Sequence, residues 1–312
     1  MRFRSALALA FASSWVLGCA VPQQAPAAEP RVVRGQAHNG GGLTISVHAP
    51  ETATYDPDAL GIGGRTVTLH IHNDGDKPAS IAGLQVTSSA SRDGVAFPCV
   101  GRAEPSLEER VPAMIGPRSS MDVDRELGCS MPLPGRYDVR VFARTEASST
   151  PRLVGAFSLD VVASARAPRP LGAPGLFALL TGRKFTQPLA DRAWREGDYH
   201  VVLAVINGSK SSIGLGPAKV SFVVYKKGSP YPCTSEAKPV SLPAELASGG
   251  VFTTQLPISC APTEEGQYEV SARLSLEGAE EIEIGRLGLQ VTRDPLLFTP
   301  LPITPLPGTN PR

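Results

Sequence analysis

A stretch that occurs twice constrains this chain more than any other feature. Its first copy runs from Leu127 to Ala143 and its second from Ile258 to Leu274. In each copy a cysteine is followed, eight positions later, by the tyrosine of a glycine-x-tyrosine motif. The motif residues are Cys129, Gly135 and Tyr137 in the first copy and Cys260, Gly266 and Tyr268 in the second.

Apolar positions outside this stretch repeat as well, at an offset of about 131 to 134 positions. Val67, Leu69, Ile71 and Asn73 correspond to Val201, Leu203, Val205 and Asn207. Such agreement at a single period predicts a duplicated domain.

Within each copy the apolar residues recur at every second position, which is the period of a strand with one buried face. Antiparallel strands of this kind bury their apolar faces by packing sheet against sheet. The sequence therefore predicts an all-β chain of two tandem β-sandwiches, over residues 41–163 and 175–293. A proline-rich linker over residues 164–174 is expected to act as an extended, semi-rigid spacer.

The N-terminus carries a short basic region with Arg2 and Arg4, and an apolar run from Ala6 to Val16 follows. A small residue and a cysteine come next, as Gly18 and Cys19. This arrangement resembles the lipobox of bacterial lipoproteins, with residues 1–18 as the signal peptide. The resemblance implies a lipid on Cys19 and attachment to the bacterial cell envelope. Ala20 favours sorting to the outer membrane, facing the periplasm or the cell surface. An ordinary secretory signal is the alternative.

Residues 19–40 are rich in proline, alanine and glutamine, and they predict a flexible tether between the lipid and the first domain. Residues 294–312 form a proline-rich tail that cannot continue a sheet. One interpretation of this tail is a segment that is disordered or docks on the chain itself. The alternative is a polyproline II segment that a partner protein binds.

Four cysteines remain beside Cys19, and an even number in an exported chain predicts disulfides. Four cysteines allow three pairings. The repeat favours one pair inside each copy, since a pairing between the copies would break their symmetry. The predicted disulfides are Cys99–Cys129 and Cys233–Cys260.

The glycine-x-tyrosine motif at the start of a late strand resembles the tyrosine corner of immunoglobulin-like and fibronectin-III-like sandwiches. The resemblance implies that Tyr137 and Tyr268 are buried and that each hydroxyl binds a nearby backbone group. The chain departs from antibody-type domains, because its cysteine precedes the tyrosine and neither copy has the core tryptophan. The Pro-Gly-Arg-Tyr-Asp-Val segment also resembles bacterial proteinase-inhibitor-like sandwiches.

The chain has 30 basic and 29 acidic residues and a net charge of +1, a balance that argues against nucleic-acid binding. His70 and His72 lie two positions apart and would share one strand face, so a metal site is one hypothesis. The alternative, which the sequence favours, is a pair of solvated side chains, and no cofactor is predicted. Trp194 is a candidate partner-binding residue; packing at the end of a sandwich or between the domains is its alternative interpretation.

No nucleophile elbow or other catalytic motif is found in the sequence. We therefore expect a non-catalytic, lipid-anchored envelope protein that acts in binding, adhesion or scaffolding, with an envelope protein as its partner. Inhibition of a protease is the alternative binding role, and an envelope enzyme is a third possibility.

Overall fold

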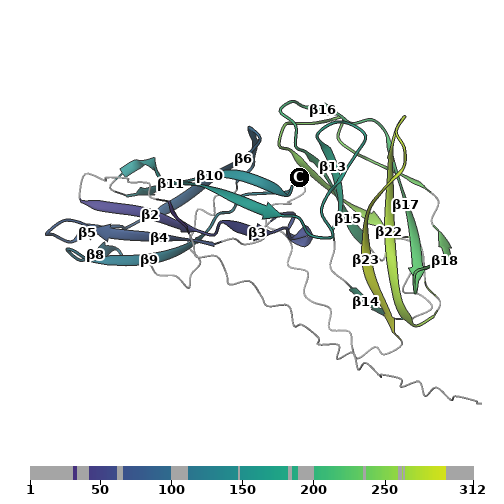
Figure 1. Ribbon diagram of the computed structural model, residues 1–312, viewed down its shortest axis with the longest axis horizontal. Helices are drawn as coiled ribbons and strands as arrows, with labels where there is room; N and C mark the ends of the chain where they lie inside the picture. Colours follow the sequence, from purple (N-terminus) through teal and green to yellow (C-terminus); the bar gives the residue numbers. More distant parts are fainter. Residues whose placement is uncertain are drawn as a thin grey trace, which may run out of the picture.

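The computed structural model describes residues 31–33, 42–61, 66–99, 112–146, 148–181, 185–188, 200–234, 237–258, 262 and 264–292. The regular secondary structure of this part of the chain is almost entirely β-strand (Figure 1). Its one helical element is a 3-10 turn, η1 (Pro57–Ala59). No helix in these ranges is long and apolar enough to cross a membrane.

The first half of the chain forms two sheets, which we call the N-terminal sheet pair. One sheet has the order β1 (Arg31–Val33), β2 (Leu43–Ala49), β4 (Thr66–Asn73), β9 (Ser120–Glu126). The other has the order β3 (Thr52–Thr54), β11 (Ser148–Val162), β10 (Gly135–Thr145), β6 (Gln85–Arg92), β7 (Val95–Phe97). The short strands β5 (Ala79–Ser80) and β8 (Met114–Ile115) pair with each other.

The second half forms the C-terminal sheet pair, in which the same order recurs. Its first sheet is β12 (Arg169–Pro170), β13 (Leu176–Thr181), β15 (His200–Asn207), β21 (Val251–Pro257). Its second sheet is β14 (Phe185–Pro188), β23 (Ile282–Thr292), β22 (Gly266–Leu276), β17 (Ala218–Lys226), β18 (Ser229–Thr234), and β19 (Lys238–Val240) also pairs with β17. The strands β16 (Ile213–Gly214) and β20 (Glu245–Leu246) pair separately.

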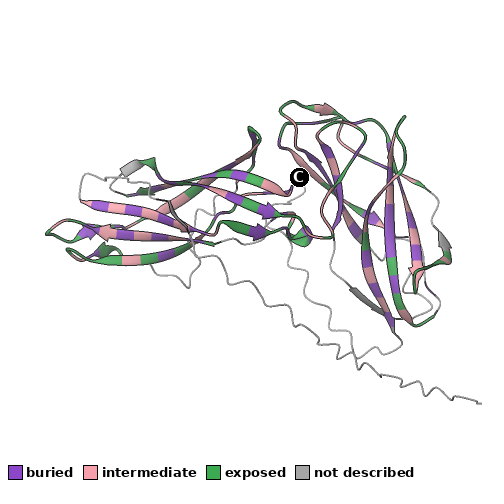
Figure 2. Ribbon diagram, viewed as in Figure 1, coloured by how far each residue is buried: buried purple, intermediate pink, exposed green. Residues whose placement is uncertain are grey.

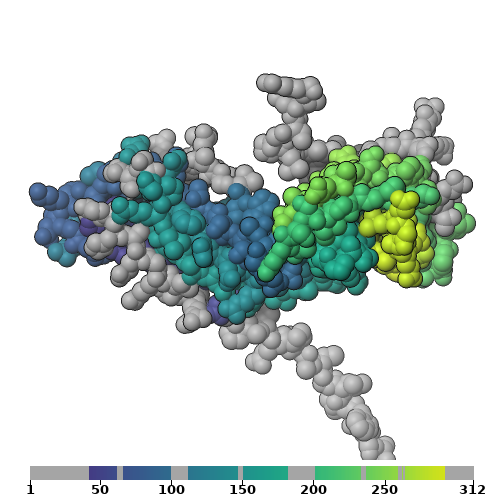
Figure 3. All heavy atoms as spheres, turned by 90° about the horizontal axis from the view of Figure 1, so that it is seen from above, coloured from purple at the N-terminus to yellow at the C-terminus, as the bar shows by residue number. Residues whose placement is uncertain are grey.

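Burial alternates along the strands as the sequence predicts, and Figure 2 shows the change of colour from residue to residue. In β4 the side chains of Val67, Leu69 and Ile71 are buried, while those of His70 and His72 reach the surface. The buried side chains of both sheets in the N-terminal pair form one apolar cluster, and those of the C-terminal pair form a second. The two pairs lie beside each other in both Figure 1 and Figure 3.

The sequence pairs Asp93-Gly94 and Lys227-Gly228 are typical of tight hairpins, and both form turns at equivalent places in the two sheet pairs. Asp93 (φ 54°) and Gly94 (φ 80°) join β6 to β7, and Lys227 (φ 51°) and Gly228 (φ 79°) join β17 to β18. Two successive residues with positive φ match the twist of the flanking strands, and glycine adopts this conformation without steric cost.

The repeated asparagines, Asn73 and Asn207, are completely buried at the ends of β4 and β15. The Asn73 amide nitrogen donates to the carbonyl oxygens of Lys77, Ile115 and Gly116, and its oxygen accepts from the Gly75 amide. The Asn207 amide nitrogen donates to two carbonyls in the same way. In each half the asparagine side chain therefore holds the following loop by the same kind of hydrogen bonds, which explains why the asparagine recurs.

The tyrosine-corner hydrogen bonds are present in both halves. The buried Tyr137 hydroxyl donates to the Leu133 carbonyl (2.7 Å) and accepts from the Leu133 amide (3.2 Å). The Tyr268 hydroxyl donates to the Glu264 carbonyl (2.8 Å). Burial raises the pKa of Tyr137 to about 12, so its hydroxyl keeps its proton and donates throughout the neutral range.

Replacing Tyr137 with phenylalanine is expected to lower the free energy of unfolding by about 1 to 3 kcal/mol, because it leaves two buried backbone groups without their partner. Tyr55 provides the matched control. Its ring is 2% exposed, yet its hydroxyl has no hydrogen-bond partner among the described residues. Tyr55→Phe should therefore leave stability unchanged or raise it. Urea denaturation measures both variants, and equal losses would contradict this account of the corner.

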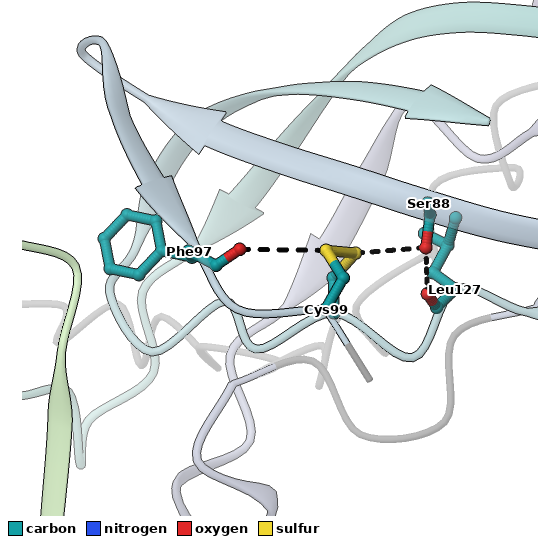
Figure 4. The surroundings of a disulfide bond; sticks show 5 residues. Ser88, Phe97, Cys99 and Leu127 are labelled. Atoms are coloured by element: carbon teal, nitrogen blue, oxygen red, sulfur yellow. Dashed lines mark hydrogen bonds between the residues drawn. A yellow bond between two sulfur atoms is a disulfide. The ribbon is translucent and has the colours of Figure 1, made fainter. Parts of the chain in front are cut away.

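The predicted disulfide between Cys99 and Cys129 is confirmed, with a sulfur–sulfur distance of 2.05 Å (Figure 4). The Ser88 side chain lies beside it, with its hydroxyl oxygen 3.2 Å from the Cys129 sulfur and also bonded to the Leu127 carbonyl. Cys233 lies in β18, but its side chain and Cys260 fall outside the described residues. The second predicted disulfide therefore stays a prediction.

Two segments differ from the sequence prediction. Within the tether expected over residues 19–40, Arg31–Val33 form strand β1, which pairs with β2. The β-branched pair Val32 and Val33 suits a strand next to this sheet edge. The remainder of the tether lies outside the described residues.

The linker is the second correction, since it is packed against the sheets rather than free as a spacer. Arg169–Pro170 pair with β13 as strand β12, and the Leu171 side chain is buried in the second apolar cluster. Arg166 forms an ion pair with Asp58 of η1, with a nitrogen–oxygen distance of 3.0 Å. A buried leucine and strand pairing outweigh the tendency of the prolines to form an isolated extended segment.

Candidate functional site

The outer face of the sheet β1-β2-β4-β9 carries histidine, aspartate and hydroxyl side chains in register. Alternation along β4 turns His70 and His72 outward, next to His48 of β2 and Asp122 of β9. We call these residues, with their outward neighbours Thr44, Ser46, Thr68, Asp74, Ser120 and Asp124, the His–Asp face.

Cross-strand hydrogen bonds order this face. His70 Nδ1 lies 2.7 Å from Asp122 Oδ1, and the two residues are direct partners in the register of β4 and β9. His72 Nδ1 lies 2.7 Å from the Ser120 hydroxyl, and its Nε2 lies 3.3 Å from Asp74 Oδ1. His70 is 42% exposed and Asp122 67% exposed, so both remain accessible to a partner.

The metal hypothesis for His70 and His72 gains no support from this geometry. Across the described ranges, no three histidine, cysteine, aspartate or glutamate side chains converge as a metal site requires. The Nδ1 atoms of His70 and His72 each contact a side chain of β9 instead. The arrangement is a hydrogen-bonded polar surface, and the aspartates give it an acidic character.

The equivalent face of the C-terminal sheet pair is apolar and buried. Ala204 and Ile206 take the places of His70 and His72, and both are 0% exposed. With Leu179 of β13 they belong to the same apolar cluster as the core of the N-terminal sheet pair. This face is therefore a docking surface, on which one sheet pair packs against the other.

Contacts around this junction involve several elements. A Cβ on Gly208, after β15, would meet the Leu133 side chain of the N-terminal pair, and the turn at Gly249 approaches the Ala96 carbonyl of β7. The Arg166–Asp58 ion pair lies between the linker and η1. In Figure 1 the end of the N-terminal pair that carries β3 meets β13 and β15.

The other predicted site residues lie outside the described residues. These are the lipidation residue Cys19, the candidate partner-binding residue Trp194, and the proline-rich tail over residues 294–312. Sequence reasoning missed a second polar surface, formed by arginines on β10. The alternation of arginine with buried residues after Gly135 was its only signal in the sequence.

Comparison with known proteins identifies no family. No protein-family model matches the chain, and no curated protein does. Among solved structures, the chain is similar to a red sea bream transglutaminase at 12% identity and a TM-score of 0.22, covering 80% of this chain and 31% of that one. It is similar to a mutant of Salmonella alpha-2-macroglobulin at 15% identity and a TM-score of 0.25, covering 82% of this chain and 17% of that one. The chain thus spans less than a third of either protein.

Proposed function

We propose that this chain is a non-catalytic binding module of the bacterial cell envelope, built from two tandem immunoglobulin-like β-sandwiches and held at the outer membrane by a lipid on Cys19. The repeated sheet order and the two tyrosine corners support the tandem immunoglobulin-like arrangement. The lipobox-like sequence before Cys19 supports the anchor.

One observation carries the binding role: equivalent faces of the two sheet pairs are used differently. In the C-terminal pair the face with Ala204 and Ile206 docks on another folded surface of the same chain. In the N-terminal pair the same face is accessible and presents His70, Asp122 and Asp124 instead. Its aspartates favour a partner surface with basic and hydrogen-bond-donating groups.

In-cell photo-crosslinking tests this proposal. With a photo-crosslinking residue in place of Ser46, between the histidines of the face, the lipidated protein should form adducts with a discrete envelope protein. The matched control carries the same residue in place of Lys219, which is exposed on the outer face of β17. A Cys19→Ser chain should leave the membrane fraction and lose the adduct.

His70→Ala with Asp122→Ala should reduce the adduct from position 46, since the pair orders the face. Adducts that form equally from positions 46 and 219, or none from position 46, would contradict a binding role for the His–Asp face. Membrane association of the Cys19→Ser chain would contradict the lipid anchor separately.

A further inference from the structure

Strand β10 carries a row of arginines on the outer face of the second N-terminal sheet. Tyr137, Val139 and Val141 turn into the core, so Arg136, Arg140 and Arg144 turn outward. Successive arginines are four positions apart, which places their Cα atoms about 13 Å from one another along the strand. Figure 3 looks down on this side of the molecule, where teal residues of β10 and β11 lie beside blue residues of β6.

The three arginines differ in how their charges are balanced. Arg136 donates to the Ser158 hydroxyl (3.0 Å), which in turn contacts Asp138, and Asp160 lies directly opposite Arg136 on β11. The Arg144 guanidinium donates to the neutral side-chain oxygen of Gln85. Arg140 makes no hydrogen bond or ion pair with any described residue. Arg140 and Arg144 therefore have no direct acidic partner among the described residues, and the carboxylates nearest to them on this face are Asp138 and Glu146, two positions away along the chain.

The cross-strand neighbours of Arg140 are small. Ser89 and Ala156 lie opposite Arg140 on the strands to either side, and Thr87 lies opposite Phe142. Leu153, also opposite Phe142, is 46% exposed. Arg140 thus lies beside the hydroxyl-bearing residues Thr87 and Ser89 and next to the partly buried Phe142 with the exposed Leu153.

The C-terminal sheet pair lacks this row. By the repeat offset of 131, the positions of Arg136, Arg140 and Arg144 are taken by Gln267, Ser271 and Ser275. The arginines that this face does carry are paired with acids. Arg286 binds Glu283 at 2.7 Å, and Arg273 lies 3.8 Å from Glu281. The fold therefore does not require arginine at these places.

We propose that the β10 arginine row binds an acidic polysaccharide, with Arg140 and Arg144 contacting its ionised groups. A planar guanidinium forms paired hydrogen bonds with carboxylate or sulfate groups. The hydroxyls of Thr87 and Ser89 suit sugar hydroxyls, and Phe142 with Leu153 suits the apolar face of a sugar ring. Arg136 contributes least, since it borders a cleft of about 210 Å³ whose lining includes Glu51 and Asp160. This proposal does not depend on the His–Asp face.

The test measures binding of the whole chain to immobilised polygalacturonate and dextran sulfate at 50 mM and 200 mM NaCl, with neutral dextran as the reference. We expect both polyanions to bind more tightly than dextran, and the tighter one identifies carboxylate or sulfate as the preferred group. The double variant Arg140→Ser with Arg144→Ser carries the residues found at the equivalent positions of the C-terminal pair. It should bind the polyanions at least tenfold more weakly. The slope of log affinity against log salt concentration should become shallower by about 2. Arg136→Gln should have a smaller effect.

Arg273→Ser with Arg286→Ser is the matched control, because it removes the same charge from the equivalent face of the other sheet pair. It should leave the affinity unchanged. Equal loss in the two double variants would mean a response to net charge alone and would overturn the proposal. Polyanion binding that is no tighter than dextran binding at 50 mM NaCl would also overturn the proposal. The arginine row would then be interpreted as a binding surface for a protein. Neither result affects the crosslinks from position 46, so the two proposals fail separately.

Discussion

Replacing Ile206 with asparagine is expected to lower the free energy of unfolding by about 3 to 5 kcal/mol and to separate the two sheet pairs. Ile206 is completely buried where the C-terminal pair docks on the N-terminal core. The substitution removes a large apolar side chain and leaves a buried amide without a partner, and each change is destabilising. Urea denaturation should reveal two transitions in place of one, and small-angle scattering should show a larger radius of gyration.

The repeat supplies a matched control for this prediction. His72 occupies the equivalent position in the N-terminal pair, where the side chain is partly exposed. His72→Asn keeps a polar side chain at a surface position, so its cost should stay below about 1 kcal/mol. Equal costs for the two substitutions, or an unchanged radius of gyration in Ile206→Asn, would mean that this junction does not hold the sheet pairs together.

The features that sequence reasoning predicted depend on short-range patterns. Alternation of apolar residues predicted the strands, Asp93-Gly94 and Lys227-Gly228 predicted their hairpins, and the glycine-x-tyrosine motif predicted the tyrosine corner. Each of these patterns specifies local backbone geometry. The repeat added the pairing of Cys99 with Cys129, because equivalent positions in two copies limit the choices.

The features that sequence reasoning missed depend on which sheet faces pack against one another. The run from Val201 to Ile206 is apolar at every position, a pattern typical of a strand buried on both faces. Its outward residues, Ala204 and Ile206, replace His70 and His72 of the first copy, and from the sequence alone this replacement indicates only that the fold does not need the histidines. The apolar run was the signal for the junction, but the surface that covers it comes from residues distant in the sequence.

The sequence also places the β10 arginines on one face of a strand, but it does not show which of their charges are compensated. Alternation assigns Arg136, Arg140 and Arg144 to one side of a strand. It does not indicate that Arg136 lies opposite Asp160 or that Ser89 and Ala156 flank Arg140. These neighbours depend on the strand order and register of the sheet, and they decide which charges are compensated.

Removing the disulfide, by Cys99→Ser with Cys129→Ser, is expected to lower the free energy of unfolding by about 3 to 4 kcal/mol. The two cysteines are separated by 30 positions, so the bond restricts a large loop in the unfolded chain. Both side chains are half-buried and pack against the N-terminal core. Urea denaturation with and without a reductant measures the effect, and the wild-type protein should match the variant when both are measured in the reductant.

The same measurement extends to the pairing that the repeat predicts for Cys233 and Cys260. If each bond stabilises only its own half, Cys233→Ser with Cys260→Ser should produce a similar loss, and all four substitutions together should produce the sum. The two bonds lie in different halves of the chain and share no partner among the described residues, so little direct coupling is expected. A loss of stability in only the first double variant would mean that the second bond does not form. A combined loss well below the sum would mean that the two halves unfold separately and not as one unit.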